Sequence, residues 1–273
     1  MRVLVASDGS ECATVAIELV AGLAWPDGTD VRIVEGVPSG TAVFGGPWPP
    51  MTPVDMKTID RSVREQAARN LDEAAQRLAG PGRTIGTATS TGRPGDAIVS
   101  LAEEAGADLI VVGSRGHGTL ETMLLGSVSA EVLDHAHVPV LVARGRRIER
   151  VVFAWDGSER AEAAVAALSE WGIFEHAHVE VLSVADAEPP WWVRAGIAGE
   201  EAAADAYHEA AEPSRRQHEE MAKQMAERLR GAGLDATPLS REGDPAETIV
   251  AVAAAHDADL VVLGTHGRTG LRR

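Results

Sequence analysis

The sequence has one cysteine, few aromatic residues and no long apolar run. Cys12 stands alone in 273 residues. No disulfide can therefore form within the chain, which favours a reducing compartment such as the cytoplasm. Aromatic residues make up 4% of the chain although 45% of it is apolar. The core must therefore consist mainly of aliphatic side chains, as in helices packed on a sheet.

Positive charge is also scarce. The formal net charge is −16, and such a surface repels phosphate backbones and anionic membranes. We therefore expect neither a nucleic-acid nor a membrane partner. No stretch reaches the apolar length of a transmembrane helix, and Met1 leads directly into a strand-like run. We expect no signal peptide and a cytoplasmic location.

What the sequence does contain is an internal repeat. Three segments occur twice: Val3–Ser10 with Val151–Ser158, Gly92–Val99 with Gly243–Val250, and Ala107–Gly113 with Ala258–Gly264. The offset is 148 residues at the start of the copies and 151 near their ends. We therefore predict two domains, 1–144 and 150–273, joined by a linker at 145–149.

Each copy alternates strand patterns with helix patterns. In the first copy, short apolar runs predict five strands: Val3–Ala6, Val31–Val37, Thr84–Ser90, Leu109–Val112 and Val138–Ala143. Helical spacing fills the intervals, and the first helix is expected to bury one face formed by Val15, Leu19, Val20 and Leu23. Strict alternation predicts an α/β fold of two tandem doubly wound parallel five-stranded sheets, Rossmann-like, which bind ligands beyond the carboxyl ends of the strands.

A glycine-rich segment follows the fourth predicted strand. Gly113-Ser114-Arg115-Gly116 leads, after nine residues, to Gly126-Ser127-Val128-Ser129. Glycines let main-chain N–H groups approach polyphosphate oxygens, and a helix starting near Ser127 would add unpaired N–H groups and a positive dipole end. The hydroxyls of Ser127 and Ser129 could donate as well, and Arg115 and His117 are the nearest cations. The segment therefore favours phosphate binding.

Three features together resemble the universal stress protein family over nearly the whole chain, twice. They are the strand followed by Asp8-Gly9-Ser10, the helix opening at Gly92-Arg93-Pro94, and the spacing Gly-x2-Gly-x9-Gly-Ser that starts at Gly113. The ATP-binding branch of that family carries this glycine spacing. The resemblance therefore implies an ATP site in the first copy, with Mg2+ carried by the phosphates.

The same resemblance assigns residues to parts of the nucleotide. Ala6, Ser7 and Asp8 would lie at the adenine and ribose end, and Val37 would contact adenine through its main chain. Gly113 and Gly116 would hold ribose and phosphate. The triphosphate would be held by the residues that open the next helix, Gly126, Ser127, Val128 and Ser129.

The second copy departs from this pattern. Gly264 and Gly267 are present, but Arg273 is reached before the next glycine, the last helix and the last strand. We therefore expect an incomplete second copy, in which Asp156, Val184, Gly264 and Gly267 are residual candidates. Because fifth strands commonly pair across a dimer in the family, Val138–Ala143 is expected to mediate self-association.

The functional hypothesis is an ATP-dependent stress-response or regulatory module with little or no catalysis. The sequence has no Gly-Lys-[Ser/Thr] signature and no evident nucleophile–His pair. A nucleotide-free dimeric scaffold of the same fold and a slow ATPase remain alternatives. The histidine pairs His135/His137 and His176/His178 have no carboxylate or cysteine partner in evident register, so we expect loop residues rather than metal ligands.

Overall fold

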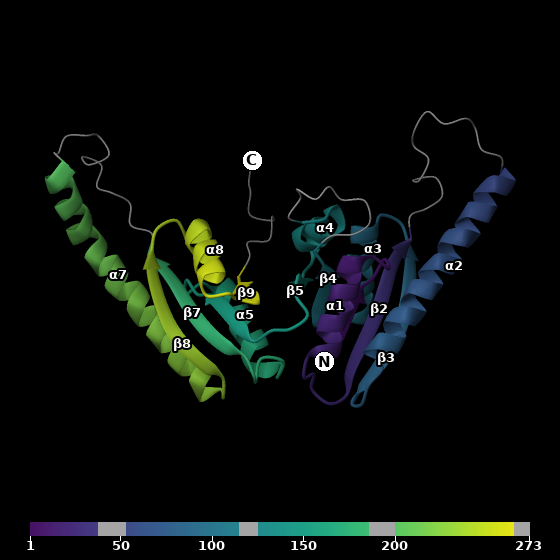
Figure 1. Cartoon of the computed structure of the whole chain (residues 1–273), viewed down its shortest axis with the longest axis horizontal. Coiled ribbons are helices and arrows are strands. Elements are labelled where there is room, and N and C mark those ends of the chain that lie inside the picture. The colour runs from purple at the N-terminus through teal and green to yellow at the C-terminus, as the bar shows by residue number, and fades with distance from the viewer. Residues whose placement is uncertain (38–52, 115–124, 186–199, 265–273) are drawn as a thin grey trace. The chain divides into compact units, whose positions relative to one another are not determined.

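The computed structural model describes residues 1–37, 53–114, 125–185 and 200–264, with only the main chain described for 53–56 and 200–210. Within this part, the chain forms two compact units, unit 1 at Met1–Arg147 and unit 2 at Ile148–His266. Each unit has its own parallel sheet, and each is treated by itself (Figure 1). None of the helices in the described part is long and apolar enough to span a membrane.

Unit 1 is a five-stranded parallel sheet in the order β3-β2-β1-β4-β5. Its strands are β1 (Arg2–Ala6), β2 (Thr29–Val37), β3 (Arg83–Thr91), β4 (Leu109–Gly113) and β5 (Val140–Ala143). The chain winds outward from β1 to β3, returns across the sheet to β4 and ends on β5. The winding direction therefore reverses between β1 and β4, where sheets of this kind bind ligands.

Four helices cover the two faces of this sheet: α1 (Glu11–Gly22), α2 (Pro53–Leu78), α3 (Pro94–Ala105) and α4 (Ser127–His135). Helices α1 and α2 pack together, as do α3 and α4. On the α3/α4 side, Leu4, Val34, Ile110 and Val132 are buried in one apolar cluster. Covering both faces explains why β1 and β4 are continuous apolar runs.

Unit 2 is a four-stranded parallel sheet within the described residues, in the order β8-β7-β6-β9. Its elements are β6 (Arg150–Ala154), α5 (Glu159–Glu170), β7 (His178–Ala185), α7 (Glu200–Gly231), β8 (Asp235–Glu242), α8 (Pro245–Ala255) and β9 (Leu260–Leu263). Its helices repeat the order of unit 1, because α5 and α7 take the places of α1 and α2, and α8 takes that of α3.

Local signals fix where the helices begin and end. The Oγ of Ser10 accepts a hydrogen bond from Ala13 N at 3.2 Å, and Ser158 caps α5 through Ala161 N at the same distance. At the other end of α3, Gly106 adopts a left-handed conformation with φ 57°. A serine before the helix and a glycine after it are the residues that such ends favour.

The predicted fold class is confirmed, with five parallel strands in one unit, four in the other and a shorter second copy. The fifth strand begins at Val140 rather than Val138, since Pro139 has no N–H to donate to the ladder. On α1, Leu19 and Val20 are buried as predicted, but Val15 and Leu23 are only partly buried. The buried face of α1 is completed instead by Ala13, Ala16 and Ile17.

The contacts of two equivalent glycines show where the second copy is longer than the first. Gly9 lies against the side chain of Asn70, and its counterpart Gly157 lies against Met221. The offset between counterparts is therefore 148 at the glycines and 151 at the helix residues. The insertion falls between the end of β7 and Met221, which leaves the strand ends of both units equivalent.

Candidate functional site

The chain leaves β1 of unit 1 in a tight turn at the carboxyl edge of the sheet. Ser7 N donates to Val34 O at 2.9 Å, which is the last contact of β1 with β2. The Oδ1 of Asp8 then accepts a hydrogen bond from Ser10 N at 3.0 Å. Between them Gly9 has a φ of 73°, a conformation that favours glycine. The turn is thus built locally and places the Asp8 carboxyl group at the strand end.

Next to this turn, successive residues of β2 point their main-chain N–H and C=O groups alternately toward β1 and toward β3. Val37 O accepts from Gly92 N at 3.0 Å, so the main chain of Val37 faces β3. Val34 O faces β1, and Gly36, two residues further on, faces the same side. Gly36 therefore presents its N–H and C=O toward the end of β1, whereas those of Val37 face β3, and the contact of Val37 with adenine stays a prediction.

Helix α2 contacts β2 through the polar side chain of Asn70, which also lies beside Gly9 of the Asp8 turn. The Nδ2 of Asn70 is 3.2 Å from one carboxylate oxygen of Glu35 and 3.3 Å from the other, and its Oδ1 accepts from Gln66 at 2.9 Å. A side chain at Gly9 would meet Asn70 at 2.7 Å. Sequence analysis missed this contact, because it joins residues 35 positions apart. The contact ties α2 to β2 next to the turn.

The first glycine of the predicted loop has a packing role. A Cβ at Gly113 would lie 2.6 Å from the carbonyl oxygen of Cys12 and 3.0 Å from Ala13 N. Only a residue without a side chain lets the first turn of α1 approach β4 so closely. Since Val5 pairs with Val111, Ser7 and Gly113 leave the sheet at the same edge. The predicted residues at the ends of β1 and β4 are therefore brought together.

The chain returns to this edge at the amino end of α4. Gly126 N donates to Ser114 O at 2.7 Å, which joins the two ends of the glycine-rich segment. Gly126 has a φ of −72°, so its backbone does not require glycine. No side chain caps α4 and no acidic residue lies in its first turn, whereas α1, α3, α5 and α8 each have an acidic first-turn residue. Among the described residues, the first turn of α4 therefore has no acidic side chain to compensate the positive end of this helix dipole.

The side chains of this first turn divide between packing and exposure. Ser129 is buried, and its hydroxyl donates to Gly113 O at 2.6 Å, so it ties α4 to the end of β4. Val128 packs on the apolar cluster of the α3/α4 face, as does Ala6. Ser127 is exposed. Arg115 and Gly116 lie outside the described residues, so their predicted roles stay predictions.

Unit 2 repeats the strand-end geometry. Asp156 Oδ1 accepts from Ser158 N at 3.0 Å, and Gly157 has a φ of 77°. A Cβ at Gly264 would lie 2.6 Å from Ala161 N, as close as the contact at Gly113. Val184 is the counterpart of Gly36, because Trp155 N donates to Leu182 O as Ser7 N donates to Val34 O. Gly267 lies outside the described residues.

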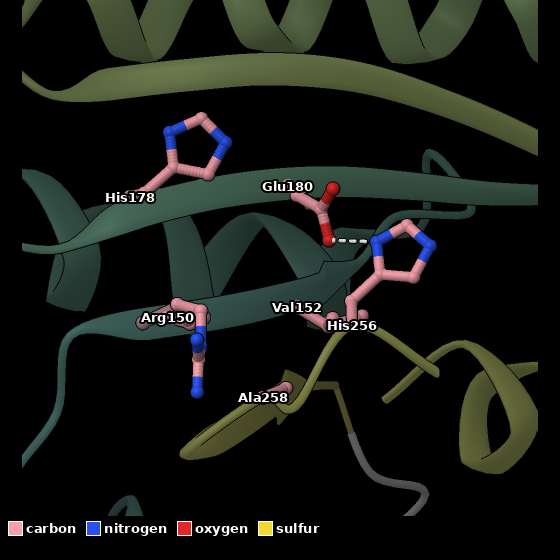
Figure 2. Close-up of a pocket in the computed structure, with 7 residues that line it drawn as sticks. Arg150, Val152, His178, Glu180, His256 and Ala258 are labelled. Atoms are coloured by element: carbon pink, nitrogen blue, oxygen red, sulfur yellow. Dashed lines mark hydrogen bonds and ion pairs between the residues drawn. The ribbon is translucent and has the colours of Figure 1, made fainter. Parts of the chain in front are cut away.

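A cavity of about 410 Å³ in unit 2 lies at the opposite edge of its sheet. Figure 2 shows Arg150 and His178, which begin β6 and β7, around it with Glu180 and His256. His256 Nδ1 lies 2.6 Å from Glu180 Oε2, and His178 Nδ1 lies 2.8 Å from Asp235 Oδ2. No group of three or more potential metal ligands occurs in the described residues. Because Arg150 and His178 stand at the amino ends of their strands, the cavity is separate from the site at the carboxyl ends.

Two expectations about histidines need correction. His178 is the first residue of β7 rather than a loop residue, and it does have a carboxylate partner, because Asp235 lies opposite it on β8. A serine–histidine pair also exists, since Ser183 Oγ is 2.9 Å from His218 Nδ1. Ser183 is fully buried, so this pair ties α7 to β7 and presents no nucleophile to a substrate.

The fold and the strand-end geometry define unit 1 as a wound α/β domain of the kind that binds ligands at the switch point of its sheet. A sequence model of the Universal stress protein family matches the chain twice, at residues 1–144 and 147–273. The chain therefore belongs to the universal stress protein family, in a tandem two-domain form.

Individual relatives agree with this assignment. Universal stress protein YxiE of Bacillus subtilis is 33% identical over 147 residues, which are 52% of this chain and 98% of that protein. A universal stress protein of Mycobacterium tuberculosis is 35% identical over 147 residues, covering 52% of this chain and 45% of its own. The crystal structure of a universal stress protein from Archaeoglobus fulgidus shares the fold, with a TM-score of 0.61 and 20% identity over 96% of this chain and 86% of that one.

Proposed function

We propose that unit 1 binds ATP at the carboxyl edge of its sheet and acts as a nucleotide-dependent regulatory module in the stress response. The observation that carries this proposal is the amino end of α4. Within the described residues, its first-turn N–H groups have no side-chain cap and no acidic residue in the same turn, and Gly126 ties them to the end of β4 through Ser114. Such a helix end is suited to a phosphate chain.

The other end of the nucleotide would lie at the ends of β1 and β2. The main chain of Gly36 offers one donor and one acceptor, which can read the edge of a planar base. The carboxylate of Asp8 lies at the neighbouring strand end and can accept from ribose hydroxyls. This arrangement replaces Val37 with Gly36 as the main-chain contact and keeps the other assignments of the resemblance.

Mg2+ would accompany the phosphates rather than occupy a site made of protein ligands. The described residues contain no cluster of three or more His, Cys, Asp or Glu side chains suited to a metal. Magnesium keeps several waters and is commonly held by one or two carboxylates together with substrate phosphates. When bound, the ion would neutralise part of the phosphate charge.

The proposed role is regulatory, with little or no catalysis. Beside α4 the described site offers main-chain N–H groups, the exposed Ser127 and the buried Ser129, whose hydroxyl is bonded to Gly113. None of these is paired with a base that could activate water. A cytoplasmic location and self-association through the edge of β5 complete the proposal. Sedimentation of the purified chain tests the self-association.

Calorimetric titration with ATP and magnesium tests the binding, and one variant tests where it occurs. Ser127 is exposed in the first turn of α4. Ser127→Glu adds an acid that favours the helix dipole and repels phosphate. We expect fold stability to be kept or slightly raised while ATP affinity falls at least tenfold.

The matched control is Ser127→Gln, which has the size of glutamate without its charge. It should keep most of the ATP affinity. Binding that is equally strong in the Glu variant would place the phosphates elsewhere. Absence of binding heat with the unmodified chain, together with no nucleotide released from purified protein, would contradict the proposal and favour a nucleotide-free scaffold.

A further inference from the structure

Arg144 directly follows the strand that pairs with β4. In the register of the two strands, Ala143 lies opposite Gly113. Ser114 N donates to Ala143 O at 3.1 Å, and Ser114 O accepts from Gly126 N at 2.7 Å. Two hydrogen bonds therefore link the end of β5, through Ser114, to the first turn of α4. Residues 29 and 12 positions apart in the sequence thus meet at the edge where the nucleotide is proposed to bind.

The alternation of β5 indicates the side on which Arg144 leaves the sheet. Val140 and Val142 pack on the apolar cluster of the α3/α4 face. Side chains two residues apart in a strand lie on the same face, so the next residue on that side is Arg144. It is exposed. Arg144 is thus placed at the end of β5 beside Ser114, whose main chain is joined to the amino end of α4.

The charges around α4 leave a role for this cation. Arg93, at the start of α3, is 2.8 Å from Glu131 of α4 and 3.9 Å from Asp96, so its charge is shared between two carboxylates. The first turn of α4 has no acidic residue that would hold Arg144 there. Arg144 does interact with the protein itself, but a guanidinium has five N–H donors and can serve more than one partner.

We propose that Arg144 binds the terminal phosphates of the nucleotide and so makes the site prefer a nucleoside triphosphate or diphosphate to a monophosphate or a nucleoside. The proposal rests on the proposed ATP site in unit 1. The α4 amides hold one side of the phosphate chain, and the planar guanidinium holds two of its oxygens from the β5 side. Arginine suits this role because its fork donates two parallel hydrogen bonds.

The test is a calorimetric titration of the full chain with ATP, AMP and adenosine, each with magnesium. Arg144→Gln should lower ATP affinity about tenfold or more and leave adenosine affinity within about twofold. Arg144→Lys keeps the charge without the fork and should fall between the two. The matched control is Arg32→Gln, which removes the same charge from an exposed position within β2.

The outcomes separate this proposal from the one beneath it. If the unmodified chain binds ATP and Arg144→Gln binds it within about twofold of the same affinity, Arg144 is not a phosphate ligand although the ATP site stands. If the variant loses ATP and adenosine affinity equally, Arg144 has a structural role and the proposal is overturned. If the unmodified chain binds no nucleotide, both proposals fail together. A loss confined to ATP supports both.

Discussion

The fourth strands of the two units have nearly the same sequence but very different surroundings. In β4 of unit 1, Leu109, Ile110, Val111 and Val112 are all at most 2% exposed. In β9 of unit 2, Leu263, the counterpart of Val112, is 47% exposed, and Val250 on α8 is 69% exposed. The same apolar run is therefore fully buried in one unit and only partly buried in the other.

The difference comes from what covers the strand. In unit 1, β5 pairs along the outer edge of β4, and α4 packs against α3. Among the described residues of unit 2, no strand pairs with the outer edge of β9. The turns at Asp8 and Asp156 and the close approach at Gly113 and Gly264 are nevertheless alike. The strand-end turn is thus a local property of the repeat, whereas the proposed phosphate-binding end includes α4, which only unit 1 has among the described residues.

The largest expected effect tests how unit 2 holds its core. Phe153 is fully buried and lies 5.9 Å from the ring of Trp155, where unit 1 has Val5 and Ser7. Phe153→Ala should destabilise unit 2 by about 3–5 kcal/mol, because the lost contacts leave a cavity. Hydrogen exchange of β6 peptides measures this loss.

Two comparisons complete that experiment. Val5→Ala in unit 1 should have a smaller effect, since valine loses fewer carbons. In Phe153→Ala, β1 should keep its protection. In the Phe153→Ala variant, a loss of stability below about 1 kcal/mol in unit 2, or an equal loss in unit 1, would contradict the view that each unit has a separate core.

The second prediction concerns the two strand-end aspartates. Asp8→Asn and Asp156→Asn each keep the Oδ1 that accepts from the serine two residues on, so both turns should persist. Only the first removes a charge from the proposed ATP site. We expect ATP affinity to fall about tenfold in Asp8→Asn, as for loss of a charged hydrogen bond, and to stay unchanged in Asp156→Asn. Equal losses in a calorimetric titration would mean that unit 2 also contributes to binding.

A third and smaller effect should be the same in both units. Ser10 and Ser158 cap α1 and α5 with equal geometry. Replacing either by alanine should cost about 1 kcal/mol in the unit that carries it. Urea unfolding followed by hydrogen exchange can assign the loss to one unit. Ser10 is 7% exposed and Ser158 is partly buried, so a larger loss at Ser10 would show that burial adds to capping.

Much of this architecture could be predicted because it depends on local patterns. Short apolar runs gave the strands, and Asp8-Gly9-Ser10 gave a turn whose hydrogen bonds join residues two and three positions apart. The glycine spacing predicted a site at the carboxyl edge of the sheet, and the structure brings Gly113 and Gly126 together at that edge through Ser114. The site itself was less predictable where it depends on strand register.

Three residues illustrate that limit. Val37 and Gly36 differ only in which neighbouring strand their main chain faces, and one residue of register reverses the answer. The hydroxyl of Ser129 donates to Gly113 O across 16 positions, a contact that the sequence pattern did not predict. Arg144 comes next to Ser114 only because β5 pairs with β4. Each of these facts depends on pairing between distant segments, which the local sequence pattern does not contain.

The smallest expected effect is a pH dependence of the stability of unit 2. In unit 2, Arg228 of α7 donates to Glu162 of α5 at 2.9 Å, and these hydrogen bonds, with the positive charge of Arg228, hold the pKa of the Glu162 carboxyl below its ordinary value of 4.5. The counterparts in unit 1 are Thr14 and Arg77, and Arg77 lies 3.5 Å from Glu18 instead. Unit 1 therefore also links its two helices by an arginine–glutamate pair, but the carboxylate stands at Glu18 rather than at position 14.

The sign follows from the lowered pKa. A carboxyl that ionises more readily in the folded state stabilises the fold above its unfolded pKa, and the stabilisation is lost as pH falls through the folded value. We expect the unfolding midpoint of unit 2 in the unmodified chain to lie slightly above that of unit 2 in the Arg228→Gln variant near neutral pH. This difference should vanish in acid. The pair is exposed, so the shift will be small and will shrink with added salt. A difference that persists below the folded pKa would mean that Arg228 acts through packing of its aliphatic stem rather than through its charge.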